Sequence, residues 1–242
     1  MKNKIALVTG ANKGIGFETA RNLGQKGYRV YLGARDKTRG EAAVKNLQNE
    51  KLDVHFLQLD VTSDASVRAA AAKLTSDEGV LDILINNAGV YLMGKDGPAS
   101  TTAVETLIET YEVNVFGPMR VTQAFVPLLK KSENASIVMV SSALGSITLL
   151  ADPNGTMSTF EAIAYNSSKS ALNGIMVGFA TDLRASGIKV NSVNPGYNST
   201  ELNGNQGTYP PSHGAAIVVK AAYIDAKNPT ATFVDEGADC PW

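Results

Sequence analysis

The chain has 242 residues, of which 44% are hydrophobic, and a formal net charge of −1. This near-neutral balance argues against nucleic acid or an anionic membrane as a partner, and it favours a small, weakly charged ligand. The single cysteine, Cys240, excludes an internal disulfide, and the distant His55 and His213 leave no ligand cluster for a structural metal.

The chain enters its first short apolar run at Ile5, and it contains no continuous apolar stretch long enough to span a membrane. A membrane-spanning helix needs about 18 or more apolar residues, and a secretory signal needs a long apolar segment at the start. We therefore expect a soluble, cytoplasmic protein without a membrane partner.

Short apolar runs bounded by turn residues alternate with helical sequence along the chain. The apolar runs lie at residues 5–8, 30–32, 54–59, 81–85, 137–140, 190–193 and 232–234. Helical composition is clearest at residues 14–26, 37–49 and 64–77, the last with Thr62 or Ser63 as its cap. This alternation predicts an α/β fold with a doubly wound, seven-stranded parallel sheet and helices on both faces. Since no linker divides the pattern, we expect one domain over residues 1–242.

Three loops that follow predicted strands are rich in glycine, proline and asparagine. They lie at about residues 90–98, 144–163 and 195–211. In an open parallel sheet, ligands bind beyond the carboxyl ends of the strands. We therefore expect these loops to hold the substrate.

The first predicted strand runs into a glycine-rich turn, and a helix begins there. Glycines let the backbone approach a pyrophosphate closely, and the positive end of the helix attracts phosphates. A tight turn without a ligand is the alternative interpretation. We assign this turn to a dinucleotide, with the candidate residues Gly10, Asn12, Lys13, Gly14, Ile15 and Gly16.

The glycine spacing Gly-x-x-x-Gly-x-Gly resembles that of the short-chain dehydrogenase/reductase family. Further motifs follow in the order that this family shows: Asn86-Asn87-Ala88-Gly89, Asn114, Ser141-Ser142, Tyr165 with Lys169, and Pro195-Gly196 with Thr200. The resemblance spans residues 5–237. It implies a Rossmann-type fold, a nicotinamide cofactor and oxidoreductase activity.

The end of the second predicted strand bears on the choice of dinucleotide. An acidic residue there accepts hydrogen bonds from the ribose of NAD, whereas the 2′-phosphate of NADP needs a cation. Ala34 stands where the NAD-type members that this chain resembles carry aspartate, and Arg35 follows it. Lys13 would add a second positive charge. These residues favour NADPH/NADP, although Asp36 could bind the ribose if the strand ended one residue later, and Arg35 could be an ordinary surface charge.

The resemblance implies further cofactor contacts beyond the glycine turn. Asp60 would bind the adenine, and Asn87 would belong to a turn that lines the groove. Asn86 and Gly89 could equally be structural, since both residue types suit tight turns. The complete set of additional cofactor residues that we expect is Asp60, Val61, Asn87, Ala88, Gly89, Tyr165, Lys169, Pro195, Gly196 and Thr200.

Tyr165 and Lys169 lie one helical turn apart, so their side chains share a helix face. A nearby ammonium favours the charged form of a phenol, and we therefore expect Lys169 to lower the pKa of Tyr165. The resemblance implies that Tyr165 is the catalytic acid, that Ser142 polarises the substrate oxygen, and that Lys169 holds the nicotinamide ribose. By the same resemblance, Asn114 supports a water next to Lys169, and Ser142 is preferred over Ser141.

The expected substrate residues are Ser142, Leu144, Tyr165 and Tyr197. Apolar residues elsewhere in the loops could line the same pocket, although those at 147–163 could equally be core or a subunit contact. They are Tyr91, Leu92, Met93, Leu149, Leu150, Met157 and Phe160. The tail at 236–242 resembles the family's subunit-contact region, which predicts a dimer or tetramer, although Trp242 could instead fold back onto its own chain.

The sequence thus predicts an NADPH-dependent carbonyl reductase that reduces a neutral, partly apolar ketone or aldehyde. One alternative is an alcohol or sugar dehydrogenase that works mainly in the oxidative direction. Another is a dinucleotide-sensing protein without turnover.

Overall fold

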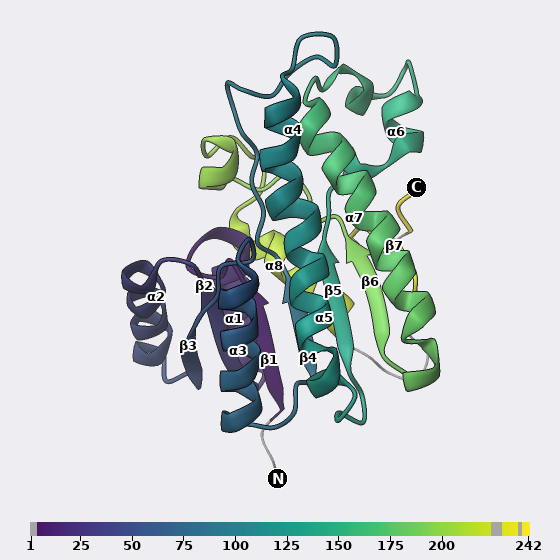
Figure 1. Cartoon of the computed structure of the whole chain (residues 1–242). Helices are drawn as coiled ribbons and strands as arrows, with labels where there is room; N and C mark the ends of the chain where they lie inside the picture. The colour runs from purple at the N-terminus through teal and green to yellow at the C-terminus, as the bar shows by residue number, and fades with distance from the viewer. Residues whose placement is uncertain (1–3, 224–228, 237–238) are drawn as a thin grey trace.

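Seven parallel strands form one twisted sheet at the centre of the computed structural model, which describes residues 4–223, 229–236 and 239–242 (Figure 1). The strands are β1 (Ile5–Thr9), β2 (Arg29–Ala34), β3 (Val54–Gln58), β4 (Ile83–Asn86), β5 (Ser136–Val140), β6 (Lys189–Val193) and β7 (Phe233–Val234). Their order is β3-β2-β1-β4-β5-β6-β7, which confirms the predicted doubly wound sheet. The direction of winding reverses between β1 and β4, and a crevice for ligands forms at such a point.

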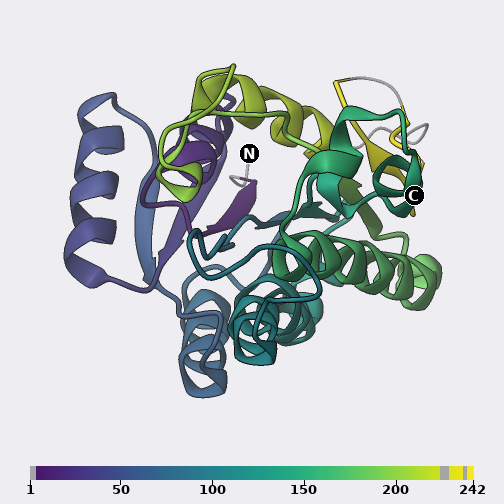
Figure 2. The ribbon, with the colours of Figure 1, turned by 90° about the horizontal axis from the view of Figure 1, so that it is seen from above.

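Helices cover both faces of the sheet, as Figure 2 shows from above. The larger helices are α1 (Gly14–Gln25), α2 (Lys37–Asn49), α3 (Asp64–Asp77), α4 (Val104–Tyr111), α5 (Gly117–Leu129), α7 (Ile163–Asp182) and α8 (Pro211–Ala222). One buried cluster joins α1, α2 and α8 to the sheet, and a second joins α3, α5 and α7. Every residue of β1, β4 and β5 is buried, because helices lie on both sides of them. Within the described ranges, no helix is both long and apolar enough to cross a membrane.

The predicted boundaries differ slightly from those of the structure. The run 81–85 becomes β4 at Ile83–Asn86, and α1 ends at Gln25 rather than at residue 26. Helix α3 begins at Asp64 as expected, and its cap is Ser63, whose hydroxyl accepts a hydrogen bond from the Ser66 backbone N–H at 3.3 Å.

A π-helical turn (η1, Glu112–Phe116) joins α4 to α5. Such turns carry one residue more than an α-helical turn and are frequent at functional sites. Asn114 lies at the middle of this turn and is completely buried.

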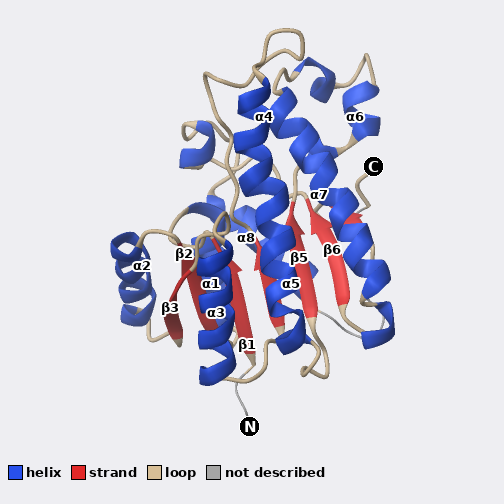
Figure 3. Ribbon diagram, viewed as in Figure 1, coloured by secondary structure: helices blue, strands red, loops and turns tan. Residues whose placement is uncertain are grey.

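The long loops gather beyond the carboxyl ends of the strands, at the top of Figure 3. They contain short helices at η2 (Ala143–Gly145), α6 (Ile147–Ala151), η3 (Thr156–Thr159) and η5 (Glu201–Asn203), and η4 (Arg184–Ser186) precedes β6. The end of the chain folds back onto this region. The Trp242 carbonyl accepts a hydrogen bond from the Thr148 backbone N–H at 2.7 Å, and its indole packs on Phe233 at 5.9 Å between ring centroids. Residues 237–238 lie outside the described part, and the expected dimer or tetramer stays a prediction.

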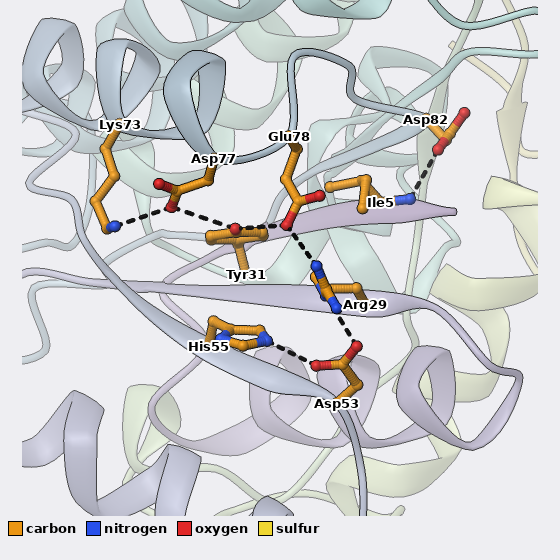
Figure 4. Close-up of polar contacts among 9 residues, drawn as sticks. All are labelled: Ile5, Arg29, Tyr31, Asp53, His55, Lys73, Asp77, Glu78 and Asp82. Carbon is orange, nitrogen blue, oxygen red and sulfur yellow. Dashed lines mark hydrogen bonds and ion pairs between the residues drawn. The ribbon is translucent and has the colours of Figure 1, made fainter. Parts of the chain in front are cut away.

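A network of hydrogen bonds and ion pairs joins β2 and β3 to the end of α3, at the opposite end of the sheet (Figure 4). The Glu78 carboxylate accepts hydrogen bonds from the Tyr31 hydroxyl at 2.8 Å and from the Arg29 guanidinium at 3.0 Å. Arg29 also donates to Asp53 at 2.9 Å, and His55 contacts the other oxygen of Asp53 at 2.6 Å. Burial raises the pKa of Tyr31, and the Glu78 hydrogen bond raises it further.

We expect Glu78→Gln to lower the free energy of unfolding by about 1 to 3 kcal/mol, because it weakens two hydrogen bonds to a mostly buried carboxylate. Lys73→Met is the control, since it removes an exposed ion pair with Asp77 that contributes about 1 kcal/mol or less. Urea denaturation followed by circular dichroism measures both. Equal stability of the two variants would contradict the importance of Glu78.

Candidate active site

A cleft of about 650 Å³ lies beyond the carboxyl ends of the central strands. All the residues expected to bind the cofactor or the substrate line this one cleft, including Arg35, Asp60, Ser142, Tyr165 and Thr200. They come from loops that are far apart in sequence. The topology therefore gathers the candidates into one place, with the glycine turn along one side.

The glycine turn can pack against the neighbouring turn at Asn87 and Ala88 only because side chains are missing from it. Gly10 and Gly14 have φ angles of 61° and 59°, in the left-handed region that favours glycine. A Cβ atom on Gly10 would lie 2.8 Å from Ala88 Cα, and one on Gly16 would collide with the Asn87 side-chain amide. Helix α1 begins here behind Lys13, whose side chain has no acceptor for the free backbone N–H groups. This arrangement fits a pyrophosphate.

Asn87 braces this turn. Its side-chain amide donates to the Thr9 carbonyl at 2.9 Å and to the Gly10 carbonyl at 3.2 Å. The Thr9 hydroxyl in turn accepts from the backbone N–H groups of Asn87 and Ala88, both at 3.0 Å. Asn86 is buried behind the turn, where it donates to the Thr122 hydroxyl at 3.0 Å. Asn86 is therefore structural, whereas Asn87 faces the cleft.

Two arginines, Arg35 and Arg39, stand at the end of the cleft where β2 leads into α2. In the part of the chain that the structure describes, the Arg35 side chain has neither an ion-pair nor a hydrogen-bond partner. Arg39, which was not predicted from the sequence, also lines the cleft and contacts Asp36 at 3.3 Å. Asp36 caps helix α2 by accepting from the Arg39 backbone N–H at 2.9 Å, which holds the pKa of this carboxyl below its usual value. Asp36 is thus engaged by the helix start.

Lys13 has a partner that the sequence did not reveal. Its ammonium contacts the Glu201 carboxylate, which belongs to η5 on the far side of the cleft. Both side chains are largely exposed. The positive charge expected from Lys13 is therefore offset by a carboxylate, as that of Arg39 is by Asp36, and Arg35 is a cation of this end without an ion-pair partner among the described residues.

Asp60 and Val61 form the neighbouring wall. The Asp60 carboxylate accepts from the Thr62 hydroxyl at 2.7 Å and from its backbone N–H at 3.0 Å, which fixes a turn after β3. Arg120 donates to the Val61 carbonyl at 2.9 Å. These bonds hold the backbone of both residues against the cleft.

Tyr165 and Lys169 stand on one face of α7, as their spacing predicts. The Lys169 ammonium lies 5.5 Å from the centroid of the Tyr165 ring, and it donates to the Val140 carbonyl at 2.9 Å. Ser142 lines the cleft with Tyr165 and acts on the pKa of its phenol, and it caps η2 by accepting from the Leu144 backbone N–H at 3.2 Å. Ser141 is buried and directs its hydroxyl to the Lys169 carbonyl at 3.5 Å, so Ser142 is the serine beside the phenol.

The prediction that Lys169 lowers the pKa of Tyr165 is wrong for the protein without a bound ligand. Burial raises the pKa of Tyr165 to about 12, against a hydrogen bond from Ser142 that lowers it. Burial also lowers the pKa of Lys169 to about 8, since its ammonium is almost fully enclosed. Desolvation of both groups outweighs their mutual effect. At neutral pH the phenol is therefore protonated, and Tyr165 is suited to donate a proton.

Asn114 lies behind the cleft and forms hydrogen bonds to two segments that line it. Its side chain accepts from the Val90 backbone N–H at 2.8 Å and donates to the Val90 carbonyl at 2.9 Å. It also donates to the Ser168 hydroxyl at 3.0 Å, next to Lys169 on α7. The structure thus places Asn114 as a link between the loop after β4 and helix α7.

The end of the cleft around Tyr165 is largely apolar. Its wall includes Tyr91, Met93, Leu144, Phe160, Tyr197 and Leu202. The Tyr91 ring lies between two of its neighbours, 5.4 Å from Tyr165 and 6.1 Å from Phe160 between centroids. Among the described residues, Leu92, Leu149, Leu150 and Met157 lie outside the cleft wall. Phe160 is thus the residue of the 147–163 stretch that reaches the site, and α6 and η3 keep some exposure throughout.

The loop after β6 closes the remaining side. Asn198 is buried there, and its amide donates to the Pro195 and Gly196 carbonyls at 2.7 and 2.9 Å. Its oxygen accepts from the Gly214 backbone N–H at 2.9 Å, which fastens the loop to α8. Asn198 was not predicted from the sequence, because asparagine is common in loops of every kind.

A family model described as short chain dehydrogenase matches residues 4–209. The chain belongs to this family. Short-chain dehydrogenases are oxidoreductases, and the family binds nicotinamide dinucleotides. The predicted resemblance is therefore confirmed.

Individual short-chain dehydrogenases are similar to the chain over most of their length. A short-chain dehydrogenase, anuI, of Penicillium roqueforti is 37% identical, with 90% of this chain and 88% of the relative covered. Salutaridine reductase of Papaver somniferum is 32% identical over 97% of this chain and 94% of its own. The crystal structure of NADPH-bound carbonyl reductase from chicken fatty liver superposes with a TM-score of 0.87, at 27% identity and with all of both chains covered.

Proposed function

We propose that the protein is an NADPH-dependent carbonyl reductase that converts a neutral, partly apolar ketone or aldehyde to the alcohol. The observation that carries this proposal is the Tyr165 phenol next to Lys169 and Ser142, in a cleft whose other end holds Arg35 and Arg39. An acid at one end and guanidinium groups at the other, of which Arg35 has no ion-pair partner among the described residues, suit carbonyl reduction with a phosphorylated dinucleotide.

Each catalytic residue has a distinct task. When bound, the dinucleotide supplies a hydride to the carbonyl carbon. Tyr165 donates its phenolic proton to the carbonyl oxygen, and Ser142 donates a hydrogen bond to the same oxygen as negative charge develops there. Lys169 would hold the nicotinamide ribose, and Thr200 would contact the carboxamide. The hydride and the proton together complete the alcohol.

The proposed choice of NADPH rests on charge at the adenosine end. A 2′-phosphate suits guanidinium groups, which bind phosphate oxygens in a bidentate manner. Arg35 and Arg39 both line this end, and Asp36 is occupied as a helix cap. The carbonyl reductase from chicken fatty liver, which this chain resembles, was crystallised with NADPH.

The proposed substrate class rests on the apolar wall. Aromatic and thioether side chains such as Tyr91, Phe160 and Met93 suit a cyclic or branched apolar body. Lys95, the cation of the 90–98 loop, is paired with Glu109 at 3.1 Å and does not favour an anionic substrate. The likeness to salutaridine reductase supports reduction as the working direction.

A panel of ketones and aldehydes, assayed with NADPH and NADH in parallel, tests the function directly. We expect NADPH oxidation with apolar cyclic or aromatic carbonyls and much slower turnover with NADH. Turnover only of alcohols with oxidised cofactor would favour the oxidative alternative. Tight dinucleotide binding without any turnover would favour a sensor.

The cofactor choice predicts the effect of one substitution. Arg35→Ala should weaken NADPH binding by about 10- to 100-fold, the effect of losing a hydrogen bond to a charged group, and leave NADH binding unchanged. Lys37→Ala is the matched control, because it removes a positive charge two residues away that lies outside the cleft. Fluorescence titration gives both dissociation constants. Equal losses for NADPH and NADH would contradict the assignment.

A further inference from the structure

We propose that Asp96, in the loop after β4, is a positioning residue for Tyr165. Helix α7 begins after Ala162, whose methyl group cannot accept a hydrogen bond from the first turn. Asp96 performs this task from a position 68 residues away from Ala164. Its two carboxylate oxygens accept from the backbone N–H groups of Ala164 at 3.0 Å and Tyr165 at 2.9 Å. Gly97 completes the cap, because its carbonyl accepts from the Ile163 N–H at 3.1 Å.

The cap acts on the catalytic residue itself. The first backbone N–H groups of a helix lack intrahelical partners, and a carboxylate there is stabilised by the helix dipole and by charge-assisted hydrogen bonds. One of these N–H groups belongs to Tyr165, so the backbone from which the phenol projects is fixed by Asp96. A further hydrogen bond, from the Gly97 backbone N–H at 2.9 Å, fixes the orientation of the carboxylate.

The same loop also contacts the Tyr165 side chain. The Tyr91 ring packs against the Tyr165 ring, with 5.4 Å between centroids and 57° between planes. Asn114 holds the loop at Val90, through two hydrogen bonds to its backbone. The segment from residue 90 to residue 97 is therefore fixed at both ends, and it meets Tyr165 at both backbone and ring.

A cap with a purely structural role would behave differently. Ser63 caps α3 in a similar way, and losing such a cap would cost stability alone. For Asp96, the capped residue is the proton donor, and a displacement on the order of 1 Å at a reacting group can lower the rate about 100-fold. We therefore expect Asp96 to affect kcat much more than it affects cofactor binding.

The experiment compares Asp96→Asn and Asp96→Ala with wild type, and it uses Glu78→Gln as a destabilised control far from the cleft. The proposal rests on the proposed function, so two kinds of readout are needed. Hydrogen–deuterium exchange at the Ala164 and Tyr165 amides reports the cap without any substrate. Steady-state kinetics with NADPH and a ketone report kcat, KM and the cofactor dissociation constant.

We expect both amides to exchange faster in Asp96→Ala, kcat to fall on the order of 10- to 100-fold, and NADPH affinity to change less than about twofold. Asp96→Asn should give an intermediate loss, because it keeps one accepting oxygen. Glu78→Gln should keep its kcat. Unchanged exchange, or faster exchange with wild-type kcat, would overturn the proposal. If wild type reduces no carbonyl, the proposed function fails, and the exchange data still decide whether Asp96 holds Tyr165.

Discussion

Tyr165→Phe should lower kcat for carbonyl reduction on the order of 1000-fold, because it removes the proton donor and leaves the ring in place. The benzyl side chain can keep its packing against Tyr91. NADPH binding should therefore change little. Stopped-flow measurement of NADPH oxidation gives the rate, and fluorescence titration gives the affinity.

The control for this substitution is Tyr111→Phe, which removes a tyrosine hydroxyl at the end of α4, outside the cleft wall. It should leave kcat within about twofold of wild type. A Tyr165→Phe enzyme that keeps a third or more of the wild-type kcat would show that another group supplies the proton.

Lys169→Met should lower kcat/KM on the order of 100-fold, the effect of removing a preorganised charged donor from a buried site. Methionine matches the length of the lysine stem but cannot donate to the Val140 carbonyl or to a ribose hydroxyl. Part of the loss should appear as weaker NADPH binding, in contrast to Tyr165→Phe. Comparing the two dissociation constants separates the roles of the residues.

The pH dependence of kcat/KM should report the protonation state of Lys169. Because burial lowers the pKa of Lys169 to about 8, its ammonium is protonated below that pH and neutral above it. The pKa of Tyr165, about 12, keeps the phenol protonated throughout this range. We therefore expect kcat/KM for reduction to be flat from pH 6 to about pH 7.5 and to fall above pH 8. An inflection near pH 8 that persists in Lys169→Met would assign it to another group.

The sheet was predictable because its strands are buried on both faces. Continuous apolar runs such as those at β1 and β5 are typical of buried parallel strands when helices separate them. The cleft followed from topology, since the carboxyl ends of parallel strands meet at one edge. The spacing of Tyr165 and Lys169 was also sufficient to predict that their side chains lie on the same side of one helix, because a regular helix fixes which residues share a face.

Long-range contacts were not predictable in this way. Lys13 and Glu201 are 188 residues apart, and Asp96 caps a helix that begins far along the chain. Both contacts depend on how loops fold over the sheet, which local patterns do not encode. The predicted direction of the Tyr165 pKa shift was wrong for a related reason. The desolvation that raises this pKa depends on tertiary packing. Arg39 could have been found from its place in the first turn of α2, four residues after Arg35.

The π turn at Glu112–Phe116 makes the long α4–α5 helix intolerant of a single deletion. Each residue of a helix turns it by about 100°, so removing one residue here would restore a regular winding and rotate one half of the helix against the other. The Asn114 amide would then point away from Val90, and the loop that carries Tyr91 and Asp96 would lose its anchor. The extra residue thus acts as a spacer, and the chain length of this helix is coupled to the geometry of a cleft that the helix lines only at Val113.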